Sequence, residues 1–178
     1  CSALRVLCLQ DEIADHTLKM LRGAMAECRM GNPGRLTTDI GPVIDSEAKA
    51  NIERHIHTMR SKGRPVFQAV RENSEDAREW QSGTFVAPTL IELDDFAELQ
   101  KEVFGPVLHV LRYNRNQLPE LIEQINASGY GLTLGVHTRI DETIAQVSGS
   151  GHVGNLYVNR NMVGAVVGVQ PFGGEGLS

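Results

Sequence analysis

Several features that assign a protein class quickly are missing from this sequence. Its apolar runs fall well short of the about 18 residues that a membrane-spanning helix needs, and no signal peptide is recognisable. Lysine and arginine total 17 against 22 acidic residues, and the net charge of -5 leaves no basic surface for nucleic acid or anionic lipid. We therefore expect a soluble segment that contacts neither nucleic acid nor membrane.

Cysteine is scarce and shows no metal pattern. The three cysteines, at positions 1, 8 and 28, form no CxxC motif, and an odd number does not suit a disulfide framework. The six histidines lack the spacing of metal ligands, and His55 and His57 would point to different faces of a helix. We expect no metal site, reduced thiols and a cytoplasmic location.

A methionine at position 1 and a standard phosphate-binding loop are also missing. The chain begins at Cys1 and ends inside a glycine-rich run, so we interpret it as a piece of a longer protein. Its two late glycine-rich segments, 163–168 and 170–174, fit neither the strand-GxGxxG-helix fingerprint nor a P-loop. The sequence therefore contains no independent dinucleotide-binding fingerprint.

The residues that are present have the composition of an ordinary globular domain, with 41% hydrophobic and 22% charged positions. A length of 178 residues predicts one domain. Short apolar segments alternate with amphipathic ones, which is typical of an α/β fold with a mostly parallel sheet flanked by helices. Strands are expected at 4–10, 66–70, 85–93, 107–113, 132–137 and 155–159. Helices are expected to begin near 11, 46, 118 and 141.

Local signals make these elements more specific. Helix N-caps are predicted at Asp11, Ser46 and Asp141. The first helix is expected to bury a stripe formed by Ile13, Thr17, Leu21, Ala24 and Cys28. Gly63 suits a left-handed residue after the second helix, and Pro88 favours an edge strand or a bulge. Gly149 predicts that the last helix ends early or is mobile. Residues 71–83 predict a solvated loop or an inserted turn, with Trp80 packed beneath it.

Judged by residue type alone, four places could carry chemistry. Cys1 stands before a predicted buried strand, where a cysteine is more often a small hydrophobe than a nucleophile. The segment 102–106, Glu-Val-Phe-Gly-Pro, could bind a ribose hydroxyl and a ring, or be an ordinary rigid loop. The segments 163–168 and 170–174 could hold an anion through backbone N–H groups or form tight turns.

Seven short motifs, read in order, reduce this ambiguity. They are Cys1, Gly-Pro-Val-Ile at 41, Gly-Thr-Phe-Val-Ala-Pro-Thr at 83, Glu-Val-Phe-Gly-Pro-Val at 102, Tyr-Gly-Leu at 130, Asn-Leu-Tyr-Val-Asn at 155 and Gln-Pro-Phe-Gly-Gly at 170. Together they resemble the C-terminal part of an aldehyde dehydrogenase over essentially the whole chain. Residues 1–5 and 159–174 are similar to Δ1-pyrroline-5-carboxylate dehydrogenases, and the surrounding sequence is most similar to the bifunctional proline utilization (PutA) enzymes.

The resemblance implies that residues 1–178 form the aldehyde dehydrogenase catalytic domain from its catalytic cysteine onward, acting in proline catabolism. The activity implied is NAD-dependent oxidation of L-glutamate γ-semialdehyde to L-glutamate, with Cys1 as the nucleophile and one oxyanion donor from its own N–H. Glu102 would bind the nicotinamide ribose, and Phe104 would pack near the nicotinamide ring. Ser2 would hold the substrate carboxylate.

Three more residues complete the substrate site that the resemblance implies. The backbone N–H groups of Gly164 and Ala165 would join Ser2 at the carboxylate, and Phe172 would flank the aliphatic part of the substrate. In the family, the side-chain oxyanion donor, the general base and the Rossmann-type cofactor domain precede the cysteine. Residues 1–178 alone are therefore expected to be inactive and to bind NAD poorly.

The resemblance also implies properties of the longer protein. These are FAD in a proline dehydrogenase domain, a homo-oligomeric state, and a cytoplasmic location that allows peripheral contact with the inner membrane. Two alternatives remain open: an aldehyde dehydrogenase for another small aldehyde, and a non-catalytic oligomerisation segment.

Overall fold

The computed structural model describes residues 2–69, 80, 83–170 and 172–178. Its contacts divide the chain into two compact units, which we call the sheet unit and the C-terminal unit. The sheet unit comprises Arg5–Asp95 and Lys101–Arg112. The C-terminal unit comprises Cys1–Leu4, Phe96–Gln100 and Tyr113–Ser178. A single catalytic domain therefore stays a prediction.

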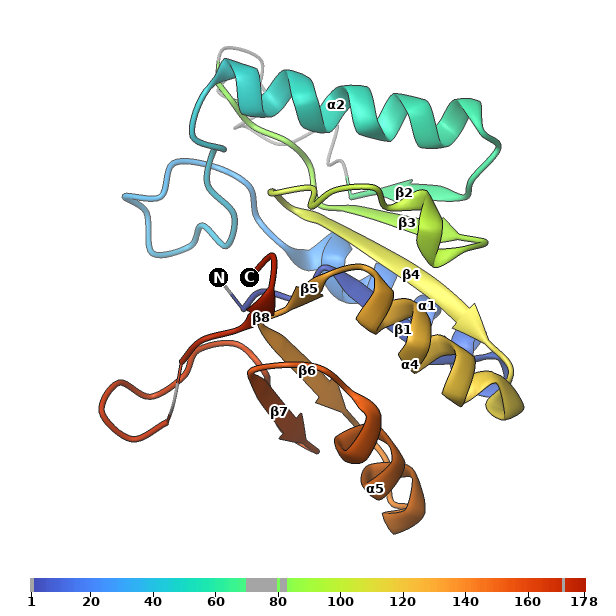
Figure 1. Ribbon diagram of the computed structural model, residues 1–178. Coiled ribbons are helices and arrows are strands. Elements are labelled where there is room, and N and C mark those ends of the chain that lie inside the picture. Colours follow the sequence, from blue (N-terminus) through green and yellow to red (C-terminus); the bar gives the residue numbers. More distant parts are fainter. Residues whose placement is uncertain (1, 70–79, 81–82, 171) are drawn as a thin grey trace. The chain divides into compact units, whose positions relative to one another are not determined.

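The sheet unit is an α/β arrangement around one four-stranded sheet (Figure 1). Its elements are β1 (Val6–Gln10), α1 (Asp11–Glu27), α2 (Ser46–Ser61), β2 (Val66–Gln68), β3 (Thr89–Leu93) and β4 (Val107–Tyr113). The strand order is β1-β4-β3-β2, with β3 and β4 parallel and β2 and β3 antiparallel. This confirms the predicted α/β class and places β4 and β3 at the centre of the sheet.

Helix α1 covers one face of this sheet. Its buried residues Ala14 and Leu18 pack in one cluster with Leu9, Leu90 and Val110. The predicted stripe was wrong at its start, because Ile13 is 51% exposed while its neighbour Ala14 is fully buried, but Leu21 packs against the cluster as predicted. Burial of each large side chain in such a cluster contributes about 1.5–3 kcal/mol.

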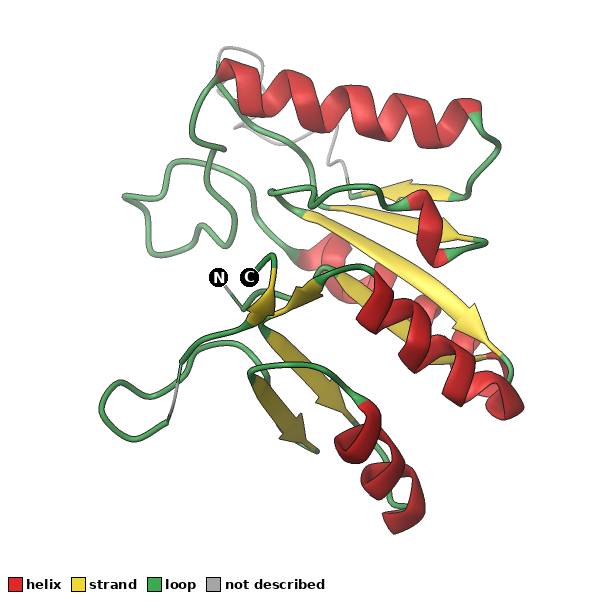
Figure 2. Cartoon of the chain, in the orientation of Figure 1, coloured by secondary structure: helices red, strands yellow, loops and turns green. Residues whose placement is uncertain are grey.

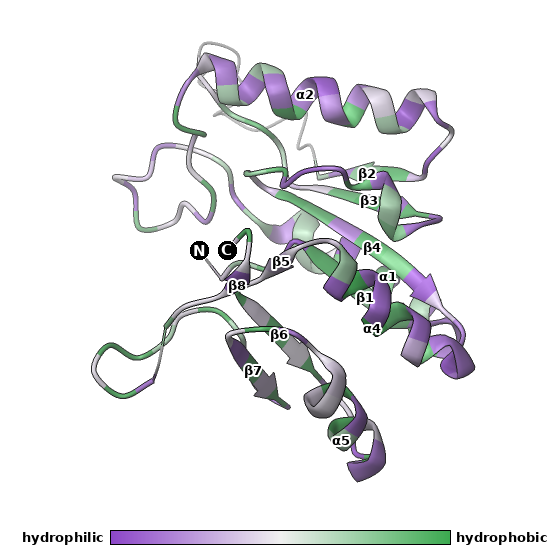
Figure 3. Ribbon diagram, viewed as in Figure 1, coloured by the Kyte–Doolittle hydropathy of each residue, from purple (hydrophilic) through white to green (hydrophobic). Residues whose placement is uncertain are grey.

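Helix α2 covers the opposite face. Ile52, Ile56 and Met59 are buried on α2, as predicted. The sheet face on this side carries Ile91 of β3 and His109 of β4, which alternate along their strands with the residues that face α1. Figure 3 shows the consequence: β4 is largely hydrophobic, whereas most of α2 is hydrophilic. A sheet buried on both faces explains why its strands read as continuous apolar runs.

The predicted helix caps were displaced by one residue. Asp11, Ser46 and Asp141 are the first residues of their helices, not the caps. The α2 cap is Asp45, whose Oδ1 accepts from the N–H of Ala48 at 2.7 Å. A carboxylate in the first helical turn is favoured by the helix dipole, so sequence alone separates cap and first turn poorly. Gly63 has φ 77°, which confirms its left-handed conformation.

Pro88 does not mark an edge strand. The strand begins one residue later, at Thr89, and β3 then lies between β2 and β4. Most of the predicted loop 71–83 lies outside the described residues. Trp80 is half-buried, and its indole N–H donates to the carbonyl of Met30 at 2.9 Å, which agrees with a packing role.

The C-terminal unit contains two short sheets and two α-helices (Figure 2). Its elements are η1 (Phe96–Glu98), η2 (Arg115–Gln117), α4 (Leu118–Ala127), β5 (Tyr130–Gly131), β6 (Thr133–Val136), α5 (Asp141–Ser150), β7 (Asn155–Val158) and β8 (Glu175–Gly176). Strands β6 and β7 are parallel, and β5 and β8 are antiparallel. The expected early end of the last helix was wrong, because α5 continues through Gly149 to Ser150.

Close backbone approaches hold the end of the C-terminal unit. A Cβ added at Gly154 would overlap the carbonyl of Gly173, and one added at Gly131 would lie 2.6 Å from the carbonyl of His152. The buried Asn155 side chain donates to the carbonyl of Gly173 at 3.1 Å. Glycine at these positions therefore lets the chain before β8 lie directly against the start of β7.

We predict that Gly154→Ala destabilises the C-terminal unit by about 1–3 kcal/mol or more, because the methyl group meets backbone that has little freedom to move. Gly149→Ala is the matched control, since its Cβ would meet nothing within 4 Å and helix propensity favours alanine by about 1 kcal/mol. Hydrogen exchange of β6 and β7 in the full-length protein measures both effects. Equal protection in the two variants would contradict the packing argument.

Candidate active site

The predicted nucleophile, Cys1, lies outside the described residues. Neither of the other two cysteines, Cys8 and Cys28, lies in an environment that favours a nucleophilic thiol. Burial raises the pKa of Cys8 to about 12, so its thiol is not ionised at neutral pH. The Cys28 thiol, half-buried after α1, lies 3.6 Å from the carbonyl oxygen of Ala24 as a weak donor.

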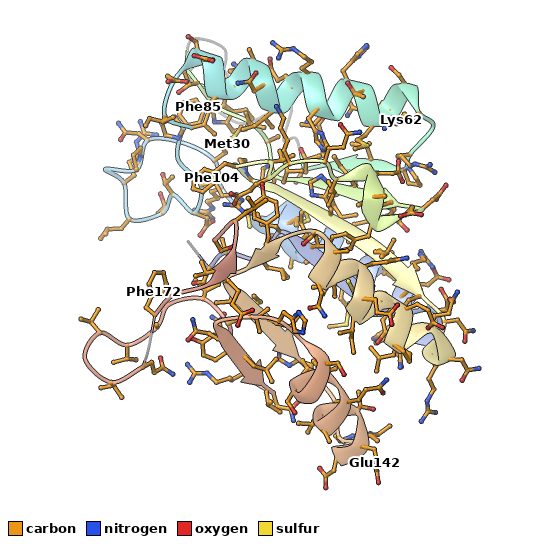
Figure 4. The ribbon with its side chains drawn as sticks, in the orientation of Figure 1. Met30, Lys62, Phe85, Phe104, Glu142 and Phe172 are labelled. Carbon is orange, nitrogen blue, oxygen red and sulfur yellow. The ribbon has the colours of Figure 1, made fainter. Side chains whose placement is uncertain are left out.

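In the sheet unit, the predicted cofactor residues stand in the loop before β4. The carboxylate of Glu102 accepts from Arg5 Nε at 3.0 Å, and Arg5 also donates through Nη1 to the carbonyl of Gly105 at 3.1 Å. The guanidinium lies over the Phe104 ring, 4.6 Å from its centroid. Phe104 is 64% exposed and is labelled in Figure 4. Arg5 therefore contacts both predicted cofactor residues.

The same loop also packs against α2. A Cβ added at Gly105 would overlap Cδ1 of Ile52, which is itself buried. The absence of a side chain at Gly105 therefore lets the loop lie against the helix without displacing Ile52. A bound NAD fits the residues present, because Glu102 offers a half-exposed carboxylate to ribose hydroxyls and Phe104 offers an exposed ring.

Two histidines of the sheet unit form a pair in which His109 is buried and His55 is half-buried. His55 of α2 and His109 of β4 have their Nε2 atoms 2.8 Å apart in an edge-to-face arrangement. Because the carbonyl of Arg5 lies 3.3 Å from His109 Nδ1 and can only accept, we assign that proton to Nδ1. Burial and then the neighbouring His55 lower the pKa of His109 from 6.5 to about 4. Burial and then Lys62 and Lys101 lower the pKa of His55.

In the C-terminal unit, the structure brings together two of the predicted substrate residues. The hydroxyl of Ser2 accepts from the N–H of Gly164 at 3.0 Å, across 162 positions of sequence. Gly164 has φ 79° in open space, so its left-handed conformation, not crowding, calls for glycine. Ala165 follows, and within the described residues its N–H has no acceptor.

The turn that follows is held by its own side chains. Asn161 accepts from the N–H of Val163 at 2.9 Å, and Gln170 accepts from the N–H of Val166 at 2.8 Å. These bonds support the tight-turn interpretation of 163–168 while leaving the N–H of Ala165 available for an anion.

Phe172 lies on the C-terminal loop before β8, where Figure 4 labels it. Its side chain is 66% exposed, so it is accessible to a substrate, but its role stays a prediction. The carbonyl of Gly173, next in the chain, lies against Gly154. The choice between anion loop and turn at 170–174 stays open.

The sequence did not identify Arg5 and His109 as parts of the candidate site in the sheet unit. Arg5 had a signal, because it is the one charged residue in the apolar segment 4–10. His109 had the same kind of signal within 107–111, which is otherwise apolar. Within the described ranges, no group of three acidic, histidine or cysteine side chains is placed to hold a metal ion. No helix in those ranges is long and apolar enough to cross a membrane.

Comparisons with known proteins agree on one family. Residues 1–178 match the aldehyde dehydrogenase family. The bifunctional protein PutA of Escherichia coli (strain K12) is 98% identical over 178 residues, which are 100% of this chain and 14% of that protein. The chain therefore spans about one seventh of that relative.

Two crystal structures extend the likeness to the fold. A mutant of Bradyrhizobium japonicum Proline Utilization A (PutA) matches with a TM-score of 0.90 and 46% identity, over 100% of this chain and 17% of that one. A 1-pyrroline-5-carboxylate dehydrogenase from Thermus with bound NAD matches with a TM-score of 0.83 and 34% identity, over 99% of this chain and 33% of that one.

We predict that the sheet unit loses stability as the pH falls from about 6.5 towards about 4. Unfolded His109 takes up a proton near its ordinary pKa of 6.5, whereas the folded residue resists until about 4, so protonation favours unfolding in that window. Thermal unfolding of the full-length protein and of His109→Asn at about pH 7 and about pH 5 tests this. An unchanged pH dependence in the variant would remove His109 as its source.

Proposed function

This chain belongs to the aldehyde dehydrogenase family, and from that premise we propose that its protein oxidises L-glutamate γ-semialdehyde to L-glutamate with NAD. The 98% identity to a bifunctional PutA protein over every residue carries this proposal. The likeness to a 1-pyrroline-5-carboxylate dehydrogenase supports the same substrate, since that compound is the cyclic form of the semialdehyde. In this proposal the chain is part of the dehydrogenase module acting in proline catabolism.

The chemistry begins at Cys1. Its thiolate adds to the aldehyde carbon, a C–S bond forms, and the carbonyl π electrons move to oxygen. The N–H of Cys1 donates to that developing oxyanion. After the hydride has left, the carbon is a thioester, and water cleaves its C–S bond to give the carboxylate and return the thiol. Sulfur suits both steps because it attacks readily and also leaves.

Ser2 and the 163–168 turn select a substrate that carries a carboxylate. The Ser2 oxygen accepts from Gly164, which leaves the hydroxyl proton to donate to an anion. The N–H of Ala165, the residue after Gly164, supplies a second donor. Phe172 would line the aliphatic part of the substrate. This arrangement supports glutamate semialdehyde over a plain alkyl aldehyde.

NAD, when bound, accepts the hydride and supplies the oxidising power of the reaction. The residues of this chain that hold it are Glu102, through the ribose hydroxyls, and Phe104, against the nicotinamide. An exposed ring beside a carboxylate fits both tasks. The phosphates and adenine would be bound by residues that precede Cys1.

For the longer protein we propose FAD in a proline dehydrogenase domain, because the relative is named bifunctional. We also propose a homo-oligomer in the cytoplasm, with peripheral contact at the inner membrane. These properties follow from the resemblance alone.

Replacement of the nucleophile gives the first test. Cys1→Ala in the full-length protein is expected to abolish NADH formation, with a loss of kcat of at least about a thousandfold, because no other group forms the thioester. NAD binding by calorimetry serves as the control and should be retained. Substantial NADH formation by the variant would contradict the proposed role of Cys1.

Ser2→Ala tests substrate selection. We expect kcat/KM for glutamate semialdehyde to fall about tenfold to a hundredfold, the size of one lost hydrogen bond to a charged group. The kcat/KM for propanal should change little, because propanal has no carboxylate. If both substrates lose equally, the serine supports the site structurally, and comparable wild-type activity on the two aldehydes would favour the alternative enzyme.

A further inference from the structure

Arg5 contacts Glu102, Phe104 and Gly105 of the loop assigned to the cofactor, although the proposed mechanism gives it no task. We propose that Arg5 is a positioning residue for NAD: it fixes the Glu102 carboxylate and the Phe104 ring in one arrangement before the nucleotide binds. This inference rests on the proposed function, because it takes Glu102 and Phe104 as the residues that hold NAD.

The main chain of Arg5 is anchored first. Its carbonyl accepts from the backbone N–H of His109 at 3.1 Å and lies 3.3 Å from the Nδ1 of the same residue. His109 is 2% exposed and is held in turn by His55 of α2. The main chain of Arg5 is therefore bonded to the central strand β4, which gives its side chain a fixed starting point.

The side chain then reaches the loop with two different nitrogens. Nε donates to Glu102 and Nη1 donates to the carbonyl of Gly105, at 3.0 and 3.1 Å. Because guanidinium is planar, these two bonds fix its orientation as well as its position. A carboxylate has about four acceptor sites, so Glu102 can accept from Arg5 and from a ribose hydroxyl together.

The plane of that guanidinium also supports Phe104. Its carbon lies 4.6 Å from the ring centroid, within the range of a cation–π contact. The ring is nevertheless 64% exposed, so Arg5 covers a minor part of it and leaves most of its surface for a ligand. Because Gly105 packs against Ile52, the backbone next to Phe104 is held in position.

The expected effect is on NAD affinity and not on aldehyde affinity. Without Arg5, Glu102 loses an ion pair and Phe104 loses a cation–π contact, so both side chains are less restrained, and ordering them on binding lowers the affinity for NAD. The aldehyde site predicted at Ser2 and Gly164 makes no use of this loop. A higher KM for NAD with an unchanged KM for the aldehyde therefore distinguishes a positioning role from a general structural defect.

The test uses the full-length protein with Arg5→Met, which keeps an apolar stem, and Arg5→Lys, which keeps the stem and the charge but loses the planar guanidinium. Arg112→Met is the matched control, because Arg112 of the sheet unit also donates from Nε and Nη1, in its case to Glu92 and Asp15. By calorimetry with NAD, we expect Kd to rise about tenfold or more for Arg5→Met, by less for Arg5→Lys, and under about twofold for Arg112→Met. The KM for NAD should rise in parallel, while the KM for the aldehyde changes under about twofold.

A double-mutant cycle tests whether Arg5 acts through Glu102. If it does, adding Arg5→Lys to Glu102→Gln should raise the Kd for NAD by much less than adding it to wild type. Additive effects would overturn the proposal, and so would wild-type NAD affinity in Arg5→Met. An equal rise for Arg112→Met would also overturn it, because the cause would then be lost stability. Should Arg5→Met not fold, Arg5→Lys and the cycle decide.

The failure of the underlying function looks different. A wild-type protein that binds no NAD, or that forms no NADH from glutamate semialdehyde, would refute the proposed function and this inference with it. A wild-type protein that does both, with unaffected Arg5 variants, would refute the positioning role alone.

Discussion

Burial of the central sheet on both faces is the constraint on which the sheet unit depends. With α1 on one side and α2 on the other, a side chain on β3 or β4 must be apolar or must find a hydrogen-bond partner inside. The polar residues there obey this rule. Thr89 donates to the carbonyl of Ala87 at 2.8 Å, and His109 is paired with His55. The imidazole pair is thus the means by which a polar group is kept in an otherwise apolar layer.

A different constraint governs the C-terminal unit, whose strands are short and whose packing relies on backbone contact. Gly154 and Gly131 leave room for neighbouring carbonyls, whereas Gly164 meets an open space and is needed for its positive φ. The same residue type therefore serves two purposes. The distinction matters for the site, because the N–H of Gly164 reaches the Ser2 hydroxyl, whereas Gly154 and Gly131 lie against neighbouring backbone.

The sequence predicted most of the elements and few of their details. Strand 107–113 was identified to the residue, because a run with apolar residues on both faces is distinctive in a buried sheet. The caps at Asp11 and Ser46 were misplaced because carboxylate and hydroxyl groups suit both the cap and the first turn. Only the family resemblance placed Ser2 and Gly164 in one site, since no local pattern links residues 162 positions apart. The contacts of Arg5 were out of reach for the same reason.

The two groups of predicted site residues are held by different kinds of interaction. Glu102 and Phe104 are held by a cation that is itself fixed to the sheet, whereas Ser2 and Gly164 are joined by one neutral hydrogen bond. A carboxylate and a ring have free rotamers that need an external partner to fix them. A backbone N–H in a turn with positive φ is already fixed by the chain. The group formed by Glu102 and Phe104 relies on long side chains and therefore needs a residue such as Arg5. The group formed by Ser2 and Gly164 relies on backbone and does not.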